Sequence, residues 1–291
     1  MHQELTQDQI QSILQGVSIP PQPQILVDLQ MEQVSPDCSI EKITQLIAQD
    51  VGLSGSILKT VNSNFFGNAN NITSIGQAAN LLGVNSVVNL VNANSIKGEL
   101  SDSQIQDLGR FWDSAMEVAM AAAAIARSIG YPNADEAYTL GLFHNCAVPL
   151  LMSRFDNYDE VINLAYGASD QSITDVENSL LKTNHAVVGY YVGKSWHLPE
   201  YLCEAIHEHH RAELSFAEPI LDPKKSTLLA ILKMAEHSCK IHQLLGCQQR
   251  DFEWERIQGS VLNYVGLSEP DFIHLQESIW ELGLGTGAYY G

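Results

Sequence analysis

The chain has 291 residues, which is enough for one large domain or two smaller ones. Hydrophobic residues make up 45% of it and charged residues 17%, so the composition is globular and not that of a disordered protein. Its 34 acidic and 15 basic residues give a net charge of −19, which argues against nucleic acid and anionic membranes as partners, because both require basic surfaces. The net charge does not exclude a small anionic ligand bound in a local pocket.

Nothing in the sequence predicts a membrane segment or a secreted protein. No apolar run reaches the roughly 18–20 residues that span a bilayer, and the N-terminal segment MHQELTQDQIQ is polar, without the core of a signal peptide. The cysteines are odd in number and form no C-x-x-C pair, so we expect reduced thiols and a cytoplasmic protein. They are Cys38, Cys146, Cys203, Cys239 and Cys247.

The N-terminal third predicts four to six short helices. Ser39 can cap a helix with an apolar face, and Ser74 and Gln77 have the spacing of a capping box before a helix that ends at Gly83. Between these helices lies NSNFFGNANNITS, residues 62–74, whose Asn and Gly content is typical of a loop. We expect Phe65-Phe66 to fill the core and not to bind a ligand.

Residues 98–109 are polar with glycine at each end and predict a junction between two helical subdomains, 1–105 and 106–291. An alanine-rich helix over 111–129 follows, and its small side chains favour a central position because neighbouring helices can approach closely. Further helices are expected over 134–152, from Ser172 or Thr174 through His185, and over 199–210. A loop is expected over 211–225, then two or three helices over 226–281 and a frayed glycine-rich tail.

Histidines are the residues most able to carry chemistry. His144 lies in GLFHN, His185 in NHAVVG, and His209 and His210 end the segment EAIHEHH. Histidines and carboxylates on separate helices of a bundle can hold a divalent metal, and Glu236 is a candidate carboxylate. For a single histidine, the ordinary alternative is a hydrogen-bonded core residue. Adjacent histidines on a helix point about 100° apart, whereas His207 and His210 could face one way.

Three segments resemble the HDOD family when taken together: IPPQPQILVDLQ, ITQLIAQDVGLSGSILKTVNSNFFG and ITSIGQAANLLGVNSVVNLV. The similarity continues through FW at 111–112, GLFHN, HAVVG, WHLP and IHEHH, and covers about residues 18–240 as one unit. It implies an all-α, bacterial protein: an HD-domain-like helical bundle preceded by an N-terminal helical subdomain. HDOD proteins are related to HD and HD-GYP metal-dependent phosphohydrolases and usually lack the full set of metal ligands.

The resemblance assigns candidate metal ligands residue by residue. Where HD enzymes have their first histidine, this chain has Ser114, and the His-Asp doublet is His144-Asn145. The additional HD-GYP histidines match His185 and the pair His209-His210, and the final aspartate corresponds most closely to Glu236. We expect the four histidines to lie near one another, in or beside a cleft.

Two of these positions argue against catalysis. Asn145 offers a neutral carbonyl oxygen in place of a bridging carboxylate, and Ser114 is not a normal ligand for a divalent metal. Hydrolysis of a phosphodiester on this fold needs a metal-bound hydroxide. No P-loop, G-x-S-x-G or dinucleotide fingerprint provides another catalytic site.

The sequence therefore favours a non-catalytic signalling module that binds a protein partner in trans, or a small anionic ligand, and uses neither nucleic acid nor membrane. No cofactor is required, although a residual divalent metal (Fe, Mn, Mg or Zn) could bind. The alternative hypothesis is a metal-dependent phosphohydrolase that uses His144, His185, His209, His210 and Glu236.

Overall fold

The structure is a computed structural model that describes residues 7–19, 24–49, 53–54, 57–58, 61–62, 72–84, 87–88, 90–91, 109–217 and 222–285. Within these ranges every regular element is a helix and no strand occurs, which confirms the all-α prediction. The helices are α1 (Gln7–Leu14), α2 (Gln24–Gln33), α3 (Ile40–Ala48), α5 (Ile75–Leu82), α8 (Gly109–Ser128), α9 (Ala134–Phe143), α10 (Val148–Arg154), α11 (Tyr158–Gly167), α12 (Ile173–Leu181), α13 (His185–Ser195), α14 (Glu200–Glu208), the 3₁₀ turn η2 (His209–Arg211), α15 (Ala212–Ala217), α16 (Pro223–Ser238), α17 (Ile241–Leu244), α18 (Phe252–Val265) and α19 (Glu269–Glu281).

Side-chain caps define helix starts in the N-terminal third. Ser39 Oγ accepts a hydrogen bond of 3.2 Å from the Lys42 amide at the start of α3, and Ser74 Oγ accepts one of 3.2 Å from the Gln77 amide at the start of α5. Gln77 also reaches back, but its Oε1 accepts from the amide of Thr73 at 2.8 Å. Both predicted helix starts are confirmed.

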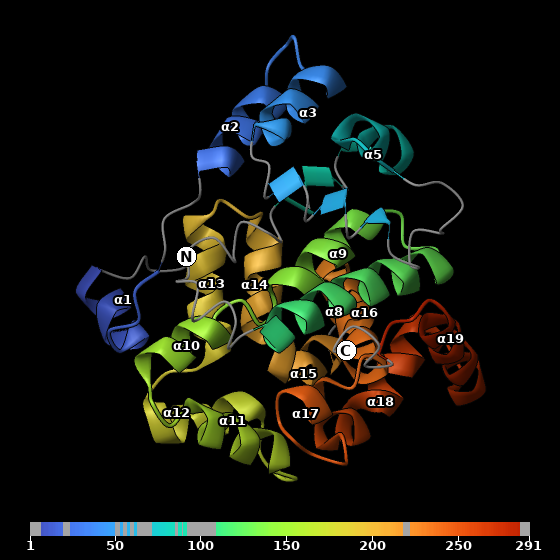
Figure 1. Cartoon of the computed structure of the whole chain (residues 1–291). Coiled ribbons are helices and arrows are strands. Elements are labelled where there is room, and N and C mark those ends of the chain that lie inside the picture. The colour runs from blue at the N-terminus through green and yellow to red at the C-terminus, as the bar shows by residue number, and fades with distance from the viewer. Residues whose placement is uncertain are drawn as a thin grey trace.

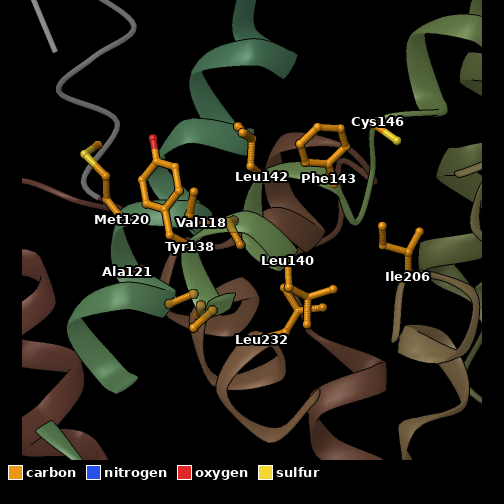
Figure 2. Close-up of a cluster of buried hydrophobic side chains, with 14 of the residues drawn as sticks. Val118, Met120, Ala121, Tyr138, Leu140, Leu142, Phe143, Cys146, Ile206 and Leu232 are labelled. Atoms are coloured by element: carbon orange, nitrogen blue, oxygen red, sulfur yellow. The ribbon is translucent and has the colours of Figure 1, made fainter. Parts of the chain in front are cut away.

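The alanine-rich helix α8 is central, as predicted. Figure 2 shows Val118 and Ala121 of α8 beside side chains of α9 and α16, Leu232 among them. Gly141 of α9 allows the two helices to approach closely, because a Cβ atom there would lie 2.8 Å from the Cα atom of Ala119. This contact places the C-terminal end of α9, where His144 follows, deep in the bundle.

The N-terminal helices form one end of the molecule. In Figure 1, α2, α3 and α5 lie together above α8, α9 and α16, whereas α1 lies apart from them, beside α10. The side chain of Arg154 on α10 donates a 3.1 Å hydrogen bond to the carbonyl of Gln15 at the end of α1. Buried hydrophobic side chains from Leu14 to Leu284 form one core cluster. The predicted subdomain boundary near residue 105 stays a prediction.

Several predicted elements differ from the structure. The segment 134–152 is two helices, α9 and α10, separated by turns at 144–147. The helix expected to run through His185 ends at Leu181, because Lys182 adopts a left-handed backbone with φ of 62° and Asn184 caps a new helix. Sequence reasoning missed α11, expected a loop where α15 lies, and expected two or three helices where α16 to α19 lie.

Some predictions fall outside the described residues. They concern most of the loop 62–74 with Phe65-Phe66, the junction at 98–108, and the tail after Gly285. Among the helices that the structure describes, none is long and apolar enough to span a membrane.

Candidate metal centre

Four buried histidines lie at helix ends. His144 is the C-terminal cap of α9, His185 is the first residue of α13, and His209 and His210 form the 3₁₀ turn that follows α14. Their exposed fractions are 0–1%. Side chains at the ends of different helices can meet at one point. Side chains in the middle of parallel helices meet less easily.

The four imidazoles contact one another. Ring centroids of His144 and His209 are 5.5 Å apart, those of His185 and His210 are 4.8 Å apart, and those of His209 and His210 are 4.0 Å apart. The Nε2 atom of His185 lies 3.3 Å from Nε2 of His209 and 3.0 Å from Nε2 of His210. The Nε2 atoms of His185, His209 and His210 therefore point at a common centre.

The Nδ1 atom of each histidine faces a hydrogen-bond acceptor. These acceptors are main-chain carbonyls or carboxylates, so each Nδ1 carries the proton and each Nε2 is left with a lone pair. This pattern of an outer acceptor behind each ring is typical of metal-binding histidines. The distances are 2.7 Å from His144 to the Gly141 carbonyl, 2.7 Å from His185 to Glu177, 2.6 Å from His209 to the Ile206 carbonyl, and 2.9 Å from His210 to Glu253.

Three converging lone pairs repel one another unless a cation or a proton lies between them. Tetrahedral zinc with nitrogen ligands at about 2.0–2.1 Å keeps those ligands about 3.3 Å apart, close to the observed separations. Burial, together with the positive charge of Lys233, holds the pKa values of His209 and His210 well below the usual value. Both rings are thus neutral at physiological pH, and the donor set of His185, His209 and His210 fits one divalent metal.

His144 and Asn145 are arranged differently. The Asn145 amide Nδ2 lies 2.8 Å from Nε2 of His144 and donates to its lone pair, since Nδ1 of that ring already donates to a carbonyl. The Oδ1 atom of Asn145 is buried and has no hydrogen-bond partner among the described residues. An aspartate could not donate in this way, so asparagine both removes a carboxylate and occupies the ligand atom of His144.

Glu236 contacts the cluster but is paired with a buried lysine. Its Oε1 lies 3.4 Å from Nε2 of His144, and its Oε2 lies 2.8 Å from Nζ of Lys233. The same ammonium lies 3.0 Å from Glu253 and is 3% exposed. Burial alone lowers the pKa of Lys233, but the two carboxylates outweigh burial and hold that pKa above its usual value.

Three residues of this centre were not found from the sequence: Glu177, Lys233 and Glu253. Glu177 is fully buried and accepts a hydrogen bond of 2.5 Å from the hydroxyl of Tyr158 in addition to its bond with His185. The only sequence signal was the ionisable residue at position 233 inside the apolar run LLAILKMAEH. A charged residue in such a run is buried and therefore paired.

The hydroxyl of Ser114 bonds within its own helix, and the histidines do not line the pocket. Ser114 is buried on α8, and its hydroxyl donates to the carbonyl of Phe111 at 2.7 Å, within its own helix. A groove of about 260 Å³ lies where α2 meets the start of α9 and the segment 197–202, and its lining includes Asp135 and Glu136. None of the four histidines lines this groove. The expectation that they lie in or beside a cleft receives no support from it.

The HDOD domain family matches residues 19–212, about two thirds of the chain. The chain belongs to the HDOD family. This match ends two residues after His210, so it includes the four histidines and leaves Lys233, Glu236 and Glu253 beyond its limit.

Related structures share the fold. An HDOD domain protein of unknown function from Geobacter sulfurreducens is 20% identical, with a TM-score of 0.66 over 94% of this chain and 96% of that one. A candidate phosphohydrolase from Shewanella amazonensis SB2B is 23% identical, with a TM-score of 0.66 over 95% of each chain. A candidate signal transduction protein from Marinobacter aquaeolei VT8 is 19% identical, with a TM-score of 0.65 over 97% of this chain and 59% of that one.

An uncharacterized protein of Treponema pallidum (strain Nichols) is 27% identical over 195 residues. The match covers 66% of this HDOD chain and 37% of that relative's length. The chain therefore corresponds to little more than a third of that relative.

Proposed function

We propose that this HDOD protein is a non-catalytic signalling module that binds partner proteins, and that its histidine centre holds at most one divalent metal. The observation that carries the proposal is the ammonium of Lys233, buried between Glu236 and Glu253 beside His210. A cation supplied by the chain pairs with both of these carboxylates and offsets one of their two negative charges. Neither is then free to bind a second metal.

The remaining donors have limited chemistry. His185, His209 and His210 would hold the metal, and Glu177 and Glu253 would orient two of the rings. A bound divalent metal would supply Lewis acidity to a coordinated water. No described carboxylate at the centre is left unpaired to take up a proton from that water, because Glu177 accepts from His185 and Tyr158, and Glu236 and Glu253 are paired with Lys233.

Burial also argues against turnover. The ligating rings are 0–1% exposed, and Glu236 is 7% exposed. A phosphodiester would have to reach nitrogen atoms that lie behind packed helices. A single metal held at this position would link the helices that supply its ligands and make them more rigid, which suits a structural or signalling role.

Exposed apolar side chains offer a surface for a partner. Met31, Val34, Ile40 and Leu81 are exposed by 42–83%, and all lie on or next to α2, α3 and α5. Figure 1 shows these three helices together at one end of the molecule. Exposed apolar residues are typical of protein interaction sites where they form a patch, and this end of the molecule carries four of the eight exposed large hydrophobic residues among those that the structure describes. The groove beside α2 contains acidic residues and favours a peptide or cationic group over an anionic ligand.

A residual metal-dependent phosphohydrolase is the second candidate. Nε2 of His185 lies 3.0 Å from Nε2 of His210 and 3.3 Å from Nε2 of His209. This favours the second candidate, because the three nitrogens could hold a metal with an open coordination position. The two proposals differ in whether the metal-loaded protein turns over a substrate.

The test is an activity and metal assay of the full chain. With added Mn²⁺, Fe²⁺ or Mg²⁺ we expect no enzyme-like hydrolysis of cyclic dinucleotides, nucleotides or bis(p-nitrophenyl) phosphate, and we expect His185→Gln to lose the metal of this centre. The double change Ser114→His with Asn145→Asp should raise metal occupancy more than Asn145→Asp alone, because a single change leaves one ligand missing. Robust turnover by the unaltered chain that His144→Ala abolishes would establish the phosphohydrolase instead.

A further inference from the structure

A second cluster of metal-ligating side chains lies outside the histidine centre. His237 at the end of α16, His242 on α17 and Asp251 before α18 have ligating atoms that all lie within 4.8 Å of one another. Nδ1 of His237 lies 2.8 Å from Oδ2 of Asp251, and Nδ1 of His242 lies 3.4 Å from the same oxygen. Two imidazole nitrogens therefore face one carboxylate oxygen.

Local backbone geometry builds this cluster. Lys240 has φ of 56°, a left-handed conformation that turns the chain sharply between α16 and α17 and brings the two rings into a stack 6.2 Å apart. Asp251 caps α18 through Oδ1, which accepts from the amide of Trp254 at 2.9 Å, so Oδ2 is left to face the two histidines. The indole of Trp254 stacks on His237 at 4.7 Å and supports the ring from one side.

His242 has a buried ring nitrogen without a hydrogen-bond partner. It is only 7% exposed, yet its Nδ1 has no hydrogen-bond partner among the described residues. Its nearest acceptor, Asp251, lies at 3.4 Å and already accepts from His237. A buried ring nitrogen aimed at a carboxylate without bonding to it is costly, and a cation between the two would remove this cost.

We propose that His237, His242 and Asp251 form a second divalent-metal site, of the kind that zinc occupies. Imidazole nitrogens and a carboxylate oxygen are preferred zinc ligands, and a site with three protein ligands leaves a position for water. The ion takes the place of the His237–Asp251 hydrogen bond, and a neutral His237 then carries its proton on Nε2. Tetrahedral ligands lie about 3.3 Å apart, so the side chains rotate inward by up to about 1.5 Å.

The position of the site suits metal exchange with solution. His237 is 25% exposed and Asp251 is 14% exposed, whereas the rings of the first centre are buried. The ligands belong to three consecutive helices, so a bound ion clamps α17 to the end of α16 and the start of α18. Stabilisation by the ion follows because the unfolded chain does not hold these ligands together.

Zinc titration of the metal-free full chain by calorimetry tests the proposal. Asp251→Asn keeps a helix-capping side chain but removes the negative charge, and His242→Gln removes a ligand. Either change should remove one zinc per chain, or weaken that binding step at least tenfold, whereas His185→Gln should leave the step intact. The matched control is His274→Gln, which removes an exposed histidine of α19 and should change nothing. Unchanged zinc binding by both site variants would overturn the proposal.

Trp254 provides a second readout that does not depend on those variants. Cu²⁺ bound beside the stacked His237 ring should quench Trp254 fluorescence, and added Zn²⁺ should reverse the quenching by competition. Trp254→Phe should abolish this part of the quenching while zinc binding remains. If Trp254→Phe leaves the Cu²⁺ quenching unchanged, the ion binds elsewhere and the proposed site is wrong.

Discussion

At the scale of single residues, Lys233 determines the electrostatics of the histidine centre. Its ammonium is 3% exposed and lies within 3.0 Å of Glu236 and Glu253. Two carboxylates and one ammonium leave a net negative charge. Burial, with a smaller contribution from Asp251, raises the pKa of Glu253 although Lys233 acts to lower it. Removing one member of such a network leaves buried charge uncompensated, which costs more free energy than the pair itself contributes.

Lys233→Met should therefore lower the free energy of unfolding by about 3–5 kcal/mol near pH 7. The cost should shrink as the pH falls from about 7 toward about 4.3, the pKa of glutamate in the unfolded chain, because burial raises the pKa of the unpaired glutamates and they take up protons first in the folded state. Mn²⁺ or Zn²⁺ should restore part of the lost stability, since the freed Glu236 faces His144. Urea unfolding at several pH values, with and without metal, measures the loss of stability, its dependence on pH and its recovery with metal.

Lys194→Met is the matched control. Lys194 pairs with Glu200 at the surface, with 44% of its side chain exposed, so its removal should cost at most about 1 kcal/mol. Equal losses in the two variants would mean that Lys233 does not neutralise a buried site.

At the scale of helices, close approach between α8 and α9 positions His144. Gly141 lies one turn before His144, and its carbonyl also accepts the hydrogen bond from Nδ1 of that ring. The backbone of α8 occupies the space where a Cβ of residue 141 would lie, with the Val118 carbonyl oxygen 3.0 Å away. The same glycine therefore allows the helix packing and orients the imidazole.

Gly141→Ala should destabilise the fold by about 1–3 kcal/mol, because backbone atoms cannot yield as a side chain would. Gly259→Ala is the matched control within α18, where a Cβ meets nothing within 4 Å, and it should be neutral or stabilise by up to about 1 kcal/mol. Thermal or urea unfolding of the two variants measures the difference. A similar effect of both changes would contradict the close contact.

Sequence patterns predicted helices well where caps and apolar faces were local, as for α3, α5 and α8. They failed where a helix breaks without glycine or proline. Lys182 and Lys240 adopt a left-handed backbone, which is unfavourable for residues with a Cβ atom. Packing of the helices before and after each lysine compensates the local strain. His185 starts a helix for this reason, and its position beside Glu177 could not be predicted from spacing.

At the scale of the whole molecule, the C-terminal helix closes the bundle. Trp280 of α19 donates to the carbonyl of Ser238 at 2.9 Å, and the amide of Gly285 donates to Glu117 of α8 at 3.0 Å. Residues beyond the family match thus cover the central helix, and α16 and α18 supply Lys233, Glu236 and Glu253. Stability of the centre is therefore a property of the entire fold.

Acid should unfold the metal-free protein in a defined range. His209 and His210 have lowered pKa values in the folded state, so above about pH 6.5 they are neutral whether the chain is folded or not. Below that pH the unfolded chain takes up protons that the folded chain cannot, and the free energy of unfolding should fall by up to about 1.4 kcal/mol per pH unit for each histidine.

Urea unfolding in the presence of a chelator, from about pH 7.5 to about pH 5, measures this slope. His210→Gln should reduce it by about one proton, whereas His274→Gln, which removes an exposed ring, should leave it unchanged. A free energy of unfolding that does not vary across this range would show that the two rings are not held neutral.

The sequence by itself determined the all-α class, the HDOD family and the identity of the central helix, because helical periodicity, capping residues and family motifs are local in the chain. It also indicated the histidines and the asparagine at 145. Only the tertiary structure decided which lone pairs converge, that Lys233 pairs with both Glu236 and Glu253, and that His237, His242 and Asp251 meet. The physical reason is that hydrogen-bond direction and burial depend on groups far apart in the chain, and no local pattern encodes them. His210 and Glu253 are 43 positions apart, and Glu117 and Gly285 are 168 positions apart.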